Sequence, residues 1–186
     1  MEKSYSYSES NFENAVIELF EKQSYKYECG YDIHRTNEEI LLTSDFKEYL
    51  NTRYSSLSLK EDEIEYLVHN LLFARGTSFY STMKLTLNQL RSGVNLDRSR
   101  YHLKQEHIDY FDFDNVGNNV FKAVNQLEVK GSTIRRPDVV IFINGIPVSV
   151  IELKNLSDAT VKMHDAYEQL HIRYSRDIEN LMRFSF

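Results

Sequence analysis

The sequence predicts an α/β domain in which a mixed β-sheet is flanked by helices. Several segments of the first half repeat apolar residues at helical spacing, which is typical of amphipathic helices. The second half contains short β-branched runs bounded by turn residues, which are typical of strands. Helices, then strands, then a further helix is the order of an α/β domain. With 186 residues and only six Gly and two Pro, we expect residues 1–186 to form a single domain without flexible linkers.

The first half is expected to be mainly helical. Phe12, Val16 and Phe20 form an apolar stripe that predicts a helix over residues 8–22, with Ser8 or Ser10 as its N-cap. A short strand is expected at 25–29. Further helices are predicted over 45–54, 61–75 and 79–91.

The second half is expected to form the sheet. Strands are predicted over residues 107–113, 119–129, 138–143 and 148–154. Asn144-Gly145 lies between the last two and is a hairpin signal. Ser157 or Asp158 can then cap a helix that continues through Tyr174.

Composition restricts the class of protein. The apolar run over 139–143 is far too short to span a bilayer, and the N-terminus lacks the apolar stretch of a signal peptide. A single cysteine, Cys29, fits a reducing cytoplasm, and no membrane association is expected. The net charge of −6 counts against a protein that coats DNA through bulk positive charge. It leaves open an enzyme whose carboxylates hold a metal, or a module that relies on partner subunits to grip DNA.

Three polar residues interrupt the two strongest strand segments. Glu152 and Lys154 occupy alternate positions and therefore share one face of a strand, and Asp138 begins the partner strand directly after a proline. Two carboxylates that converge from neighbouring strands suit Mg²⁺, and a nearby ammonium can orient an attacking water and offset phosphoryl charge. The alternative is a surface ion pair between Glu152 and Lys154.

Pro137-Asp138 followed by Glu152-Leu153-Lys154 resembles the PD-(D/E)xK nuclease motif. The stretch RRPDVVIFINGIPVSVIELKN resembles the N-terminal nuclease domain of the restriction (R) subunit of type I restriction-modification enzymes. The resemblance extends upstream through NNVFKAVNQLEVKG and downstream to YEQLHIRYSRDIENLMRFSF. It implies a restriction-endonuclease-like fold and a fragment of a longer chain, since the helicase-type motor and its phosphate loop are absent from this sequence.

The resemblance also implies roles for individual residues. Asp138 and Glu152 would hold the metal, and Lys154 would be the catalytic lysine. An acidic residue of the first helix would join the metal site, with Glu13 as first choice and Glu9 as second; the alternative for both is a solvated helix face. Gln169 and Tyr174 would complete the site, although five positions place them about 140° apart on an ideal α-helix.

The leading hypothesis is therefore a Mg²⁺-dependent endonuclease domain that cuts double-stranded DNA. The resemblance implies ATP only in the absent motor, modification and specificity subunits as partners, and no small-molecule substrate. One alternative is a non-catalytic module that holds DNA or docks a partner, and a weaker one is a nuclease for RNA or recombination intermediates. The basic residues Lys130, Arg135 and Arg136 could contact phosphate or serve solubility alone.

The strand register provides a geometric test. If Asn144-Gly145 formed a regular two-residue turn, Asp138 would face Ile151, on the opposite side from Glu152. A three-residue loop, Asn144-Gly145-Ile146, or an equivalent one-residue β-bulge would bring Asp138 opposite Glu152. We predict one of these two irregularities.

Overall fold

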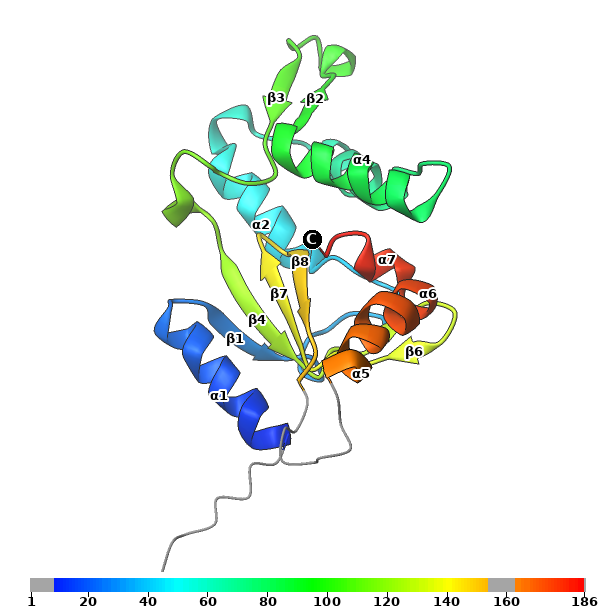
Figure 1. The fold of residues 1–186 in the computed structure, drawn as a ribbon. Helices are drawn as coiled ribbons and strands as arrows, with labels where there is room; N and C mark the ends of the chain where they lie inside the picture. Colours follow the sequence, from blue (N-terminus) through cyan, green and yellow to red (C-terminus); the bar gives the residue numbers. More distant parts are fainter. Residues whose placement is uncertain (1–8, 154–162, 186) are drawn as a thin grey trace, which may run out of the picture.

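A four-stranded mixed sheet forms the centre of the computed structural model, which describes residues 9–153 and 163–185 (Figure 1). Strand β1 pairs in parallel with β4, whereas β4–β7 and β7–β8 are antiparallel. The strand order is β1 (Lys26–Cys29), β4 (Phe121–Asn125), β7 (Val139–Ile143) and β8 (Ile146–Ile151). The predicted fold class, a restriction-endonuclease-like mixed sheet flanked by helices, is confirmed. No helix in these two ranges is long and apolar enough to cross a membrane.

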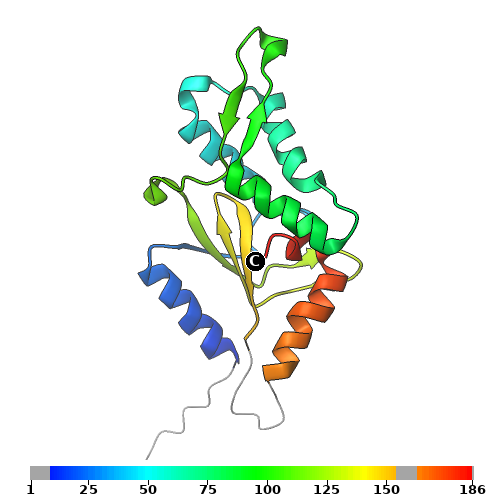
Figure 2. The ribbon, with the colours of Figure 1, turned by 45° about the horizontal axis from the view of Figure 1, so that its top comes forward.

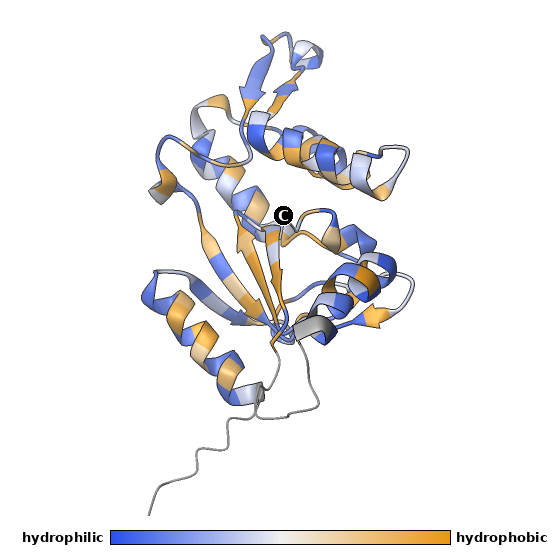
Figure 3. Ribbon diagram, viewed as in Figure 1, coloured by the Kyte–Doolittle hydropathy of each residue, from blue (hydrophilic) through white to orange (hydrophobic). Residues whose placement is uncertain are grey.

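Alternation along β7 divides the protein into two cores. Val139 and Ile141 face helix α1 (Glu9–Lys22), where they pack with Ile17. Val140 and Phe142 face the larger core on the other side of the sheet. Figure 3 shows the central strands as mostly apolar, as expected for strands that are buried on both faces.

The larger core is covered by the remaining helices. Figure 2 shows the β2–β3 hairpin, in green, projecting from this layer at the top of the view. The elements are α2 (Thr43–Arg53), α3 (Glu61–Phe73), α4 (Phe79–Ser92), β2 (Val94–Leu96), β3 (Glu106–Ile108), β5 (Val129–Lys130), β6 (Ile134–Arg135), α5 (Met163–Glu168), the π-helix η4 (Gln169–Tyr174), α6 (Ser175–Asp177) and α7 (Glu179–Met182). Short 3₁₀ turns occupy η1 (Ser55–Leu57), η2 (Ser99–Tyr101) and η3 (Val116–Asn118).

The helices predicted over 45–54, 61–75 and 79–91 are confirmed to within two residues at each end. Ser10 lies inside α1 and is therefore not its N-cap, whereas Ser8 lies outside the described residues. The predicted caps Ser157 and Asp158 also lie outside them.

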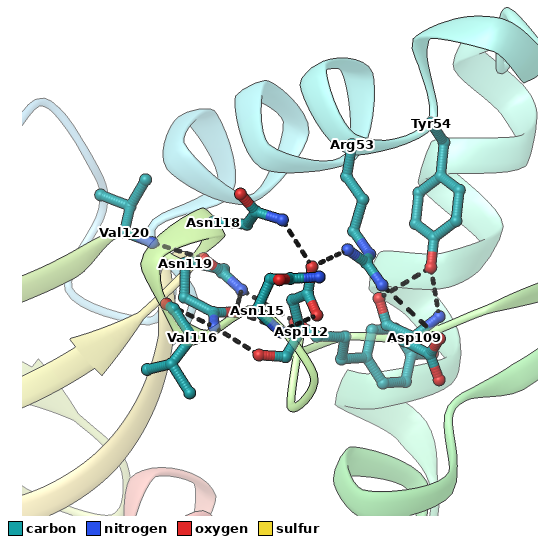
Figure 4. A network of polar contacts seen from close by, with 11 residues as sticks. Arg53, Tyr54, Asp109, Asp112, Asn115, Val116, Asn118, Asn119 and Val120 are labelled. Carbon is teal, nitrogen blue, oxygen red and sulfur yellow. Dashed lines mark hydrogen bonds and ion pairs between the residues drawn. The ribbon is translucent and has the colours of Figure 1, made fainter.

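The strand predicted over 107–113 is wrong beyond Ile108, because side-chain hydrogen bonds replace a ladder there (Figure 4). The buried Asp112 carboxylate accepts hydrogen bonds from the Asn118 amide at 2.8 Å and the Asn115 N–H at 2.9 Å, and it also pairs with Arg53 of α2. Side chains that hydrogen-bond to nearby backbone groups replace the hydrogen bonds that a paired strand would make. Residues 109–120 therefore form a connection that these contacts hold against α2.

The strand predicted over 119–129 is also too long. β4 ends at Asn125, and Gln126 adopts a left-handed backbone with φ of 53°. This conformation breaks the strand, so Val129 and Lys130 pair instead with β6 in a separate two-stranded sheet.

Candidate active site

The β7–β8 hairpin contains the irregularity on which the site depends. Asn144 and Gly145 both have positive φ, 53° and 77°, and form a two-residue turn closed by Ile143 and Ile146. The three-residue loop is therefore wrong, but the alternative β-bulge is confirmed: the register shifts between Ile141 and Phe142. Beyond the shift Val139 pairs with Ile151, so the same register carried one residue further sets Asp138 opposite Glu152.

The bulge also determines which face these carboxylates share. By alternation Asp138 lies on the face of Val140, and Glu152 on the face of Val150. Both valines belong to the larger core, together with Tyr174 of the C-terminal helices. The two acidic residues therefore emerge on the side covered by η4, at the end of the sheet where β8 finishes and α5 begins (Figure 1).

The π-helix corrects the expectation that Gln169 and Tyr174 point apart. Hydrogen bonds from i to i+5 widen each turn of η4, so residues five positions apart return to the same face. The Gln169 Nε2 donates to the Tyr174 hydroxyl at 2.9 Å, and that hydroxyl donates to Glu152 Oε2 at 2.8 Å. Three of the predicted site residues thus form one hydrogen-bonded chain.

Burial and charge keep the Tyr174 hydroxyl protonated. Its pKa is raised chiefly by burial; the hydrogen bond from Gln169 opposes this shift, whereas the charges of Glu152 and Asp138 add to it. Tyr174 is therefore a fixed donor to Glu152 at neutral pH.

Asp138 is tied to the end of the neighbouring strand. Its Oδ2 accepts a hydrogen bond from the Leu153 N–H at 2.6 Å, and Pro137 before it is buried. The bond fixes the Asp138 side chain beside the residue that separates Glu152 from Lys154. Lys154 itself lies outside the described residues.

Glu13 lies at the same end of the sheet, on α1. Its carboxylate accepts hydrogen bonds from the side chains of Asn125 and Gln126, at the end of β4. Within residues 9–153 and 163–185, no three carboxylate, His or Cys side chains gather as a group that could hold a metal. Glu13 is thus not assembled with Asp138 and Glu152 into such a group, and its metal role stays a prediction. The side chain of Glu9 lies outside the described part.

The donor set of Asp138 and Glu152 suits a divalent cation. Both are carboxylates from adjacent strands on one face, and both are only half-buried. Mg²⁺ is commonly bound through one or two carboxylates, with waters and substrate phosphates as the other ligands. A third protein carboxylate is therefore not required.

Comparison with known proteins agrees with this geometry. The family model described as "Type I restriction enzyme R protein N terminus" matches residues 6–185. The chain belongs to this family.

Individual relatives are also named as endonuclease subunits of type I restriction enzymes. The chain is 29% identical over 190 residues to the "Putative type I restriction enzyme MjaIXP endonuclease subunit" of Methanocaldococcus jannaschii, which covers 93% of this chain and 17% of the relative. It is 28% identical over 196 residues to the "Type I restriction enzyme HindI endonuclease subunit" of Haemophilus influenzae, covering 96% and 18%. The "Type I restriction enzyme EcoprrI endonuclease subunit" of Escherichia coli is 35% identical over 75 residues, covering 40% and 23%. The chain therefore spans less than a fifth of the length of the first two.

In this R protein N-terminal domain the predicted basic cluster is largely engaged by protein groups. Lys130 pairs with Glu38 at 2.7 Å, and Arg135 pairs with the buried carboxylate of Asp177. Arg136 lies over the ring of Tyr31 and donates to its hydroxyl. These contacts favour a structural role for the first two residues.

Sequence reasoning missed Asn125 and Gln126 altogether. They follow an apolar strand segment, and amides in that place carry no spacing signal for chemistry. A polar pair that interrupts the apolar alternation of residues 119–129 was the one available hint.

Proposed function

We propose that this chain is the Mg²⁺-dependent DNA endonuclease domain of a type I restriction enzyme R subunit, folded as a single domain over residues 1–186. The β-bulge of the β7–β8 hairpin is the observation that carries the proposal. It converts a register that would separate Asp138 from Glu152 into one that opposes them on a single face. A surface hairpin without a functional site would not require this shift in register.

Each side chain has a role that follows from its position. Asp138 and Glu152 would hold the divalent ion, which supplies charge stabilisation at the scissile phosphate when bound. Sequence alternation predicts that Lys154 shares a face with Glu152, and Lys154 would orient the attacking water and offset phosphoryl charge. Tyr174 would hold the Glu152 carboxylate in one orientation through its 2.8 Å hydrogen bond, and Gln169 would fix Tyr174 in turn.

The grip on double-stranded DNA would come from outside this domain. The chain has a net charge of −6, and Lys130 and Arg135 are already paired with carboxylates. Because 28 acidic residues outnumber the 22 Lys and Arg residues, the domain has no net positive charge with which to neutralise phosphates. We infer that modification and specificity subunits select the DNA, and that motor domains in the rest of the subunit translocate it at the expense of ATP before cleavage.

Plasmid cleavage by the assembled full-length enzyme tests this function. In that assembly, Asp138→Asn and Glu152→Gln should each lower DNA cleavage by about 100-fold or more, as expected when a transition-state stabiliser is lost. ATP hydrolysis should persist. Glu48→Gln, which removes an exposed carboxylate of α2, is the matched control and should cleave normally. Full cleavage by both site variants would overturn the proposal, and would favour a non-catalytic DNA-holding domain if their DNA binding fell instead.

A further inference from the structure

Two amide side chains at the end of β4 hold the carboxylate of Glu13. The Asn125 Nδ2 donates to Glu13 Oε1 at 2.7 Å. The Gln126 Nε2 lies 2.9 Å from each of the two carboxylate oxygens. A half-buried carboxylate with three such contacts has a defined position rather than the freedom of a solvated helix face.

Gln126 also contacts Asp138, through its backbone. Its N–H donates to the Asp138 carbonyl at 3.3 Å, and its left-handed φ of 53° turns the chain out of β4 at this point. The side chain of this one residue therefore reaches Glu13 on α1 while its main chain meets the start of β7. Gln126 therefore links two acidic residues that the family resemblance places at one metal site.

The donors that hold Glu13 are neutral. Within the described part of the chain, neither Lys nor Arg pairs with Glu13, whereas Glu28 and Asp45 share Lys122, and Asp177 binds two arginines. An ion pair cancels the charge of a carboxylate, whereas a neutral amide donor adds no opposite charge. Glu13 thus keeps its attraction for a cation.

Asn125 is anchored so that its amide group faces α1. It is buried, and it pairs with Cys29 of β1 on one side and Val139 of β7 on the other. Its Oδ1 accepts a hydrogen bond from the Tyr27 hydroxyl at 3.1 Å, which directs Nδ2 toward Glu13. Asn125 therefore holds its hydrogen bond to Glu13 in a fixed position, and Gln126 connects Glu13 to Asp138.

We propose that Gln126 is a positioning residue that fixes Glu13 relative to Asp138 and thereby sets the affinity of this end of the sheet for a divalent cation. The inference rests on the proposed function, which assigns the cation to Asp138 and Glu152. Among the described residues Glu13 does not group with these two as a direct ligand set, so in this proposal it would reach the cation through hydration water. Mg²⁺ and Mn²⁺ suit this arrangement, since Mg²⁺ in particular retains several waters when bound to protein.

Gln126→Gly separates the side chain from the backbone. Glycine adopts positive φ at no steric cost, so the variant keeps the left-handed turn and its N–H while it loses the contact with Glu13. Ser58→Gly is the matched control, because Ser58 also has a positive φ, 47°, and is exposed in the turn after η1. Mn²⁺ binding to the chain, measured by calorimetry and electron paramagnetic resonance, should weaken about 10-fold in Gln126→Gly and remain unchanged in Ser58→Gly.

A double-mutant cycle shows whether Gln126 acts through Glu13. Glu13→Gln should itself weaken Mn²⁺ binding, and Gln126→Gly should then add no further loss, because its partner has gone. Circular dichroism and thermal melting establish that every variant is folded, so a loss of Mn²⁺ affinity does not reflect unfolding. Independent, additive losses in the double variant would overturn the positioning role.

Asp138→Asn separates failure of the inference from failure of the proposed function. If Asp138→Asn abolishes Mn²⁺ binding and Gln126→Gly leaves it unchanged, the role of Gln126 is wrong and the metal assignment stands. If Asp138→Asn has no effect on Mn²⁺ binding, the proposed metal site is wrong, and the inference is overturned with it.

Discussion

Tyr174→Phe removes a single oxygen atom from the candidate active site and leaves the ring in its buried place. The hydroxyl joins Gln169 to Glu152 with bonds of 2.9 and 2.8 Å, and the side chain is 2% exposed. A hydrogen bond to a charged group contributes about 1.5–3 kcal/mol, and a neutral one about 0.5–1.5 kcal/mol. Both partners are half-buried, so water can replace part of what is lost. We therefore expect a loss of about 1–3 kcal/mol in the free energy of unfolding.

Urea denaturation and thermal melting measure this loss. For a chain of this size each kcal/mol lowers the melting temperature by about 2–4 °C. Tyr49→Phe is the matched control: Tyr49 is also buried, but its hydroxyl has no hydrogen-bond partner among the described residues. Deleting that hydroxyl should be neutral or slightly stabilising. If Tyr174→Phe were as stable as the parent chain, or changed no more than Tyr49→Phe, the hydroxyl bridge to Glu152 would be refuted.

Four further predictions concern stability and DNA binding. Arg98→Met should cost about 3–5 kcal/mol in urea, since it leaves the Glu63 carboxylate buried without the guanidinium that contacts it at 2.7 and 3.0 Å. Burial raises the pKa of Glu63, but hydrogen bonds from Arg98 and the Lys60 N–H outweigh burial and lower the pKa overall. The ionised Glu63 therefore stabilises the folded parent chain. Acidification below the ordinary pKa of 4.5 should destabilise the parent chain more than it destabilises the Arg98→Met variant. Gly145→Ala should lose about 1–3 kcal/mol, because φ is +77° and an added Cβ would lie 2.4 Å from the Leu42 carbonyl oxygen. In a gel-shift assay at physiological salt the chain alone should bind duplex DNA weakly, and tight binding would contradict the argument from its charge of −6.

The β-hairpin at the site could be predicted because its signals are local. Asn144-Gly145 determines the turn, and the demand that Asp138 and Glu152 share a face requires one extra residue in the pairing. The sequence did not determine whether that residue lies in the loop or in a bulge. Tertiary packing favours the short turn. The turn lies against the start of α2, where the Leu42 N–H donates to the Gly145 carbonyl at 2.8 Å.

The π-helix could not be predicted from periodicity. Helical patterns assume the α spacing, under which Gln169 and Tyr174 diverge, and nothing local in QLHIRY indicates a wider turn. Its basis is tertiary: Tyr174 must reach both the core and Glu152. Similarly, the contact of Gln126 at the end of β4 with Glu13 on a distant helix is one that no local pattern contains.

The proposed function requires that Asp138 and Glu152 together hold a divalent cation. A crystal structure of the chain soaked in Mn²⁺, with anomalous scattering measured at the manganese edge, locates that ion directly. We expect one strong peak bonded to a carboxylate oxygen of each residue, at about 2.0–2.2 Å, with Glu13 reached through water. Peaks confined to other carboxylates, or a Mn²⁺ ion bonded to Glu13 without Asp138 and Glu152, would contradict it.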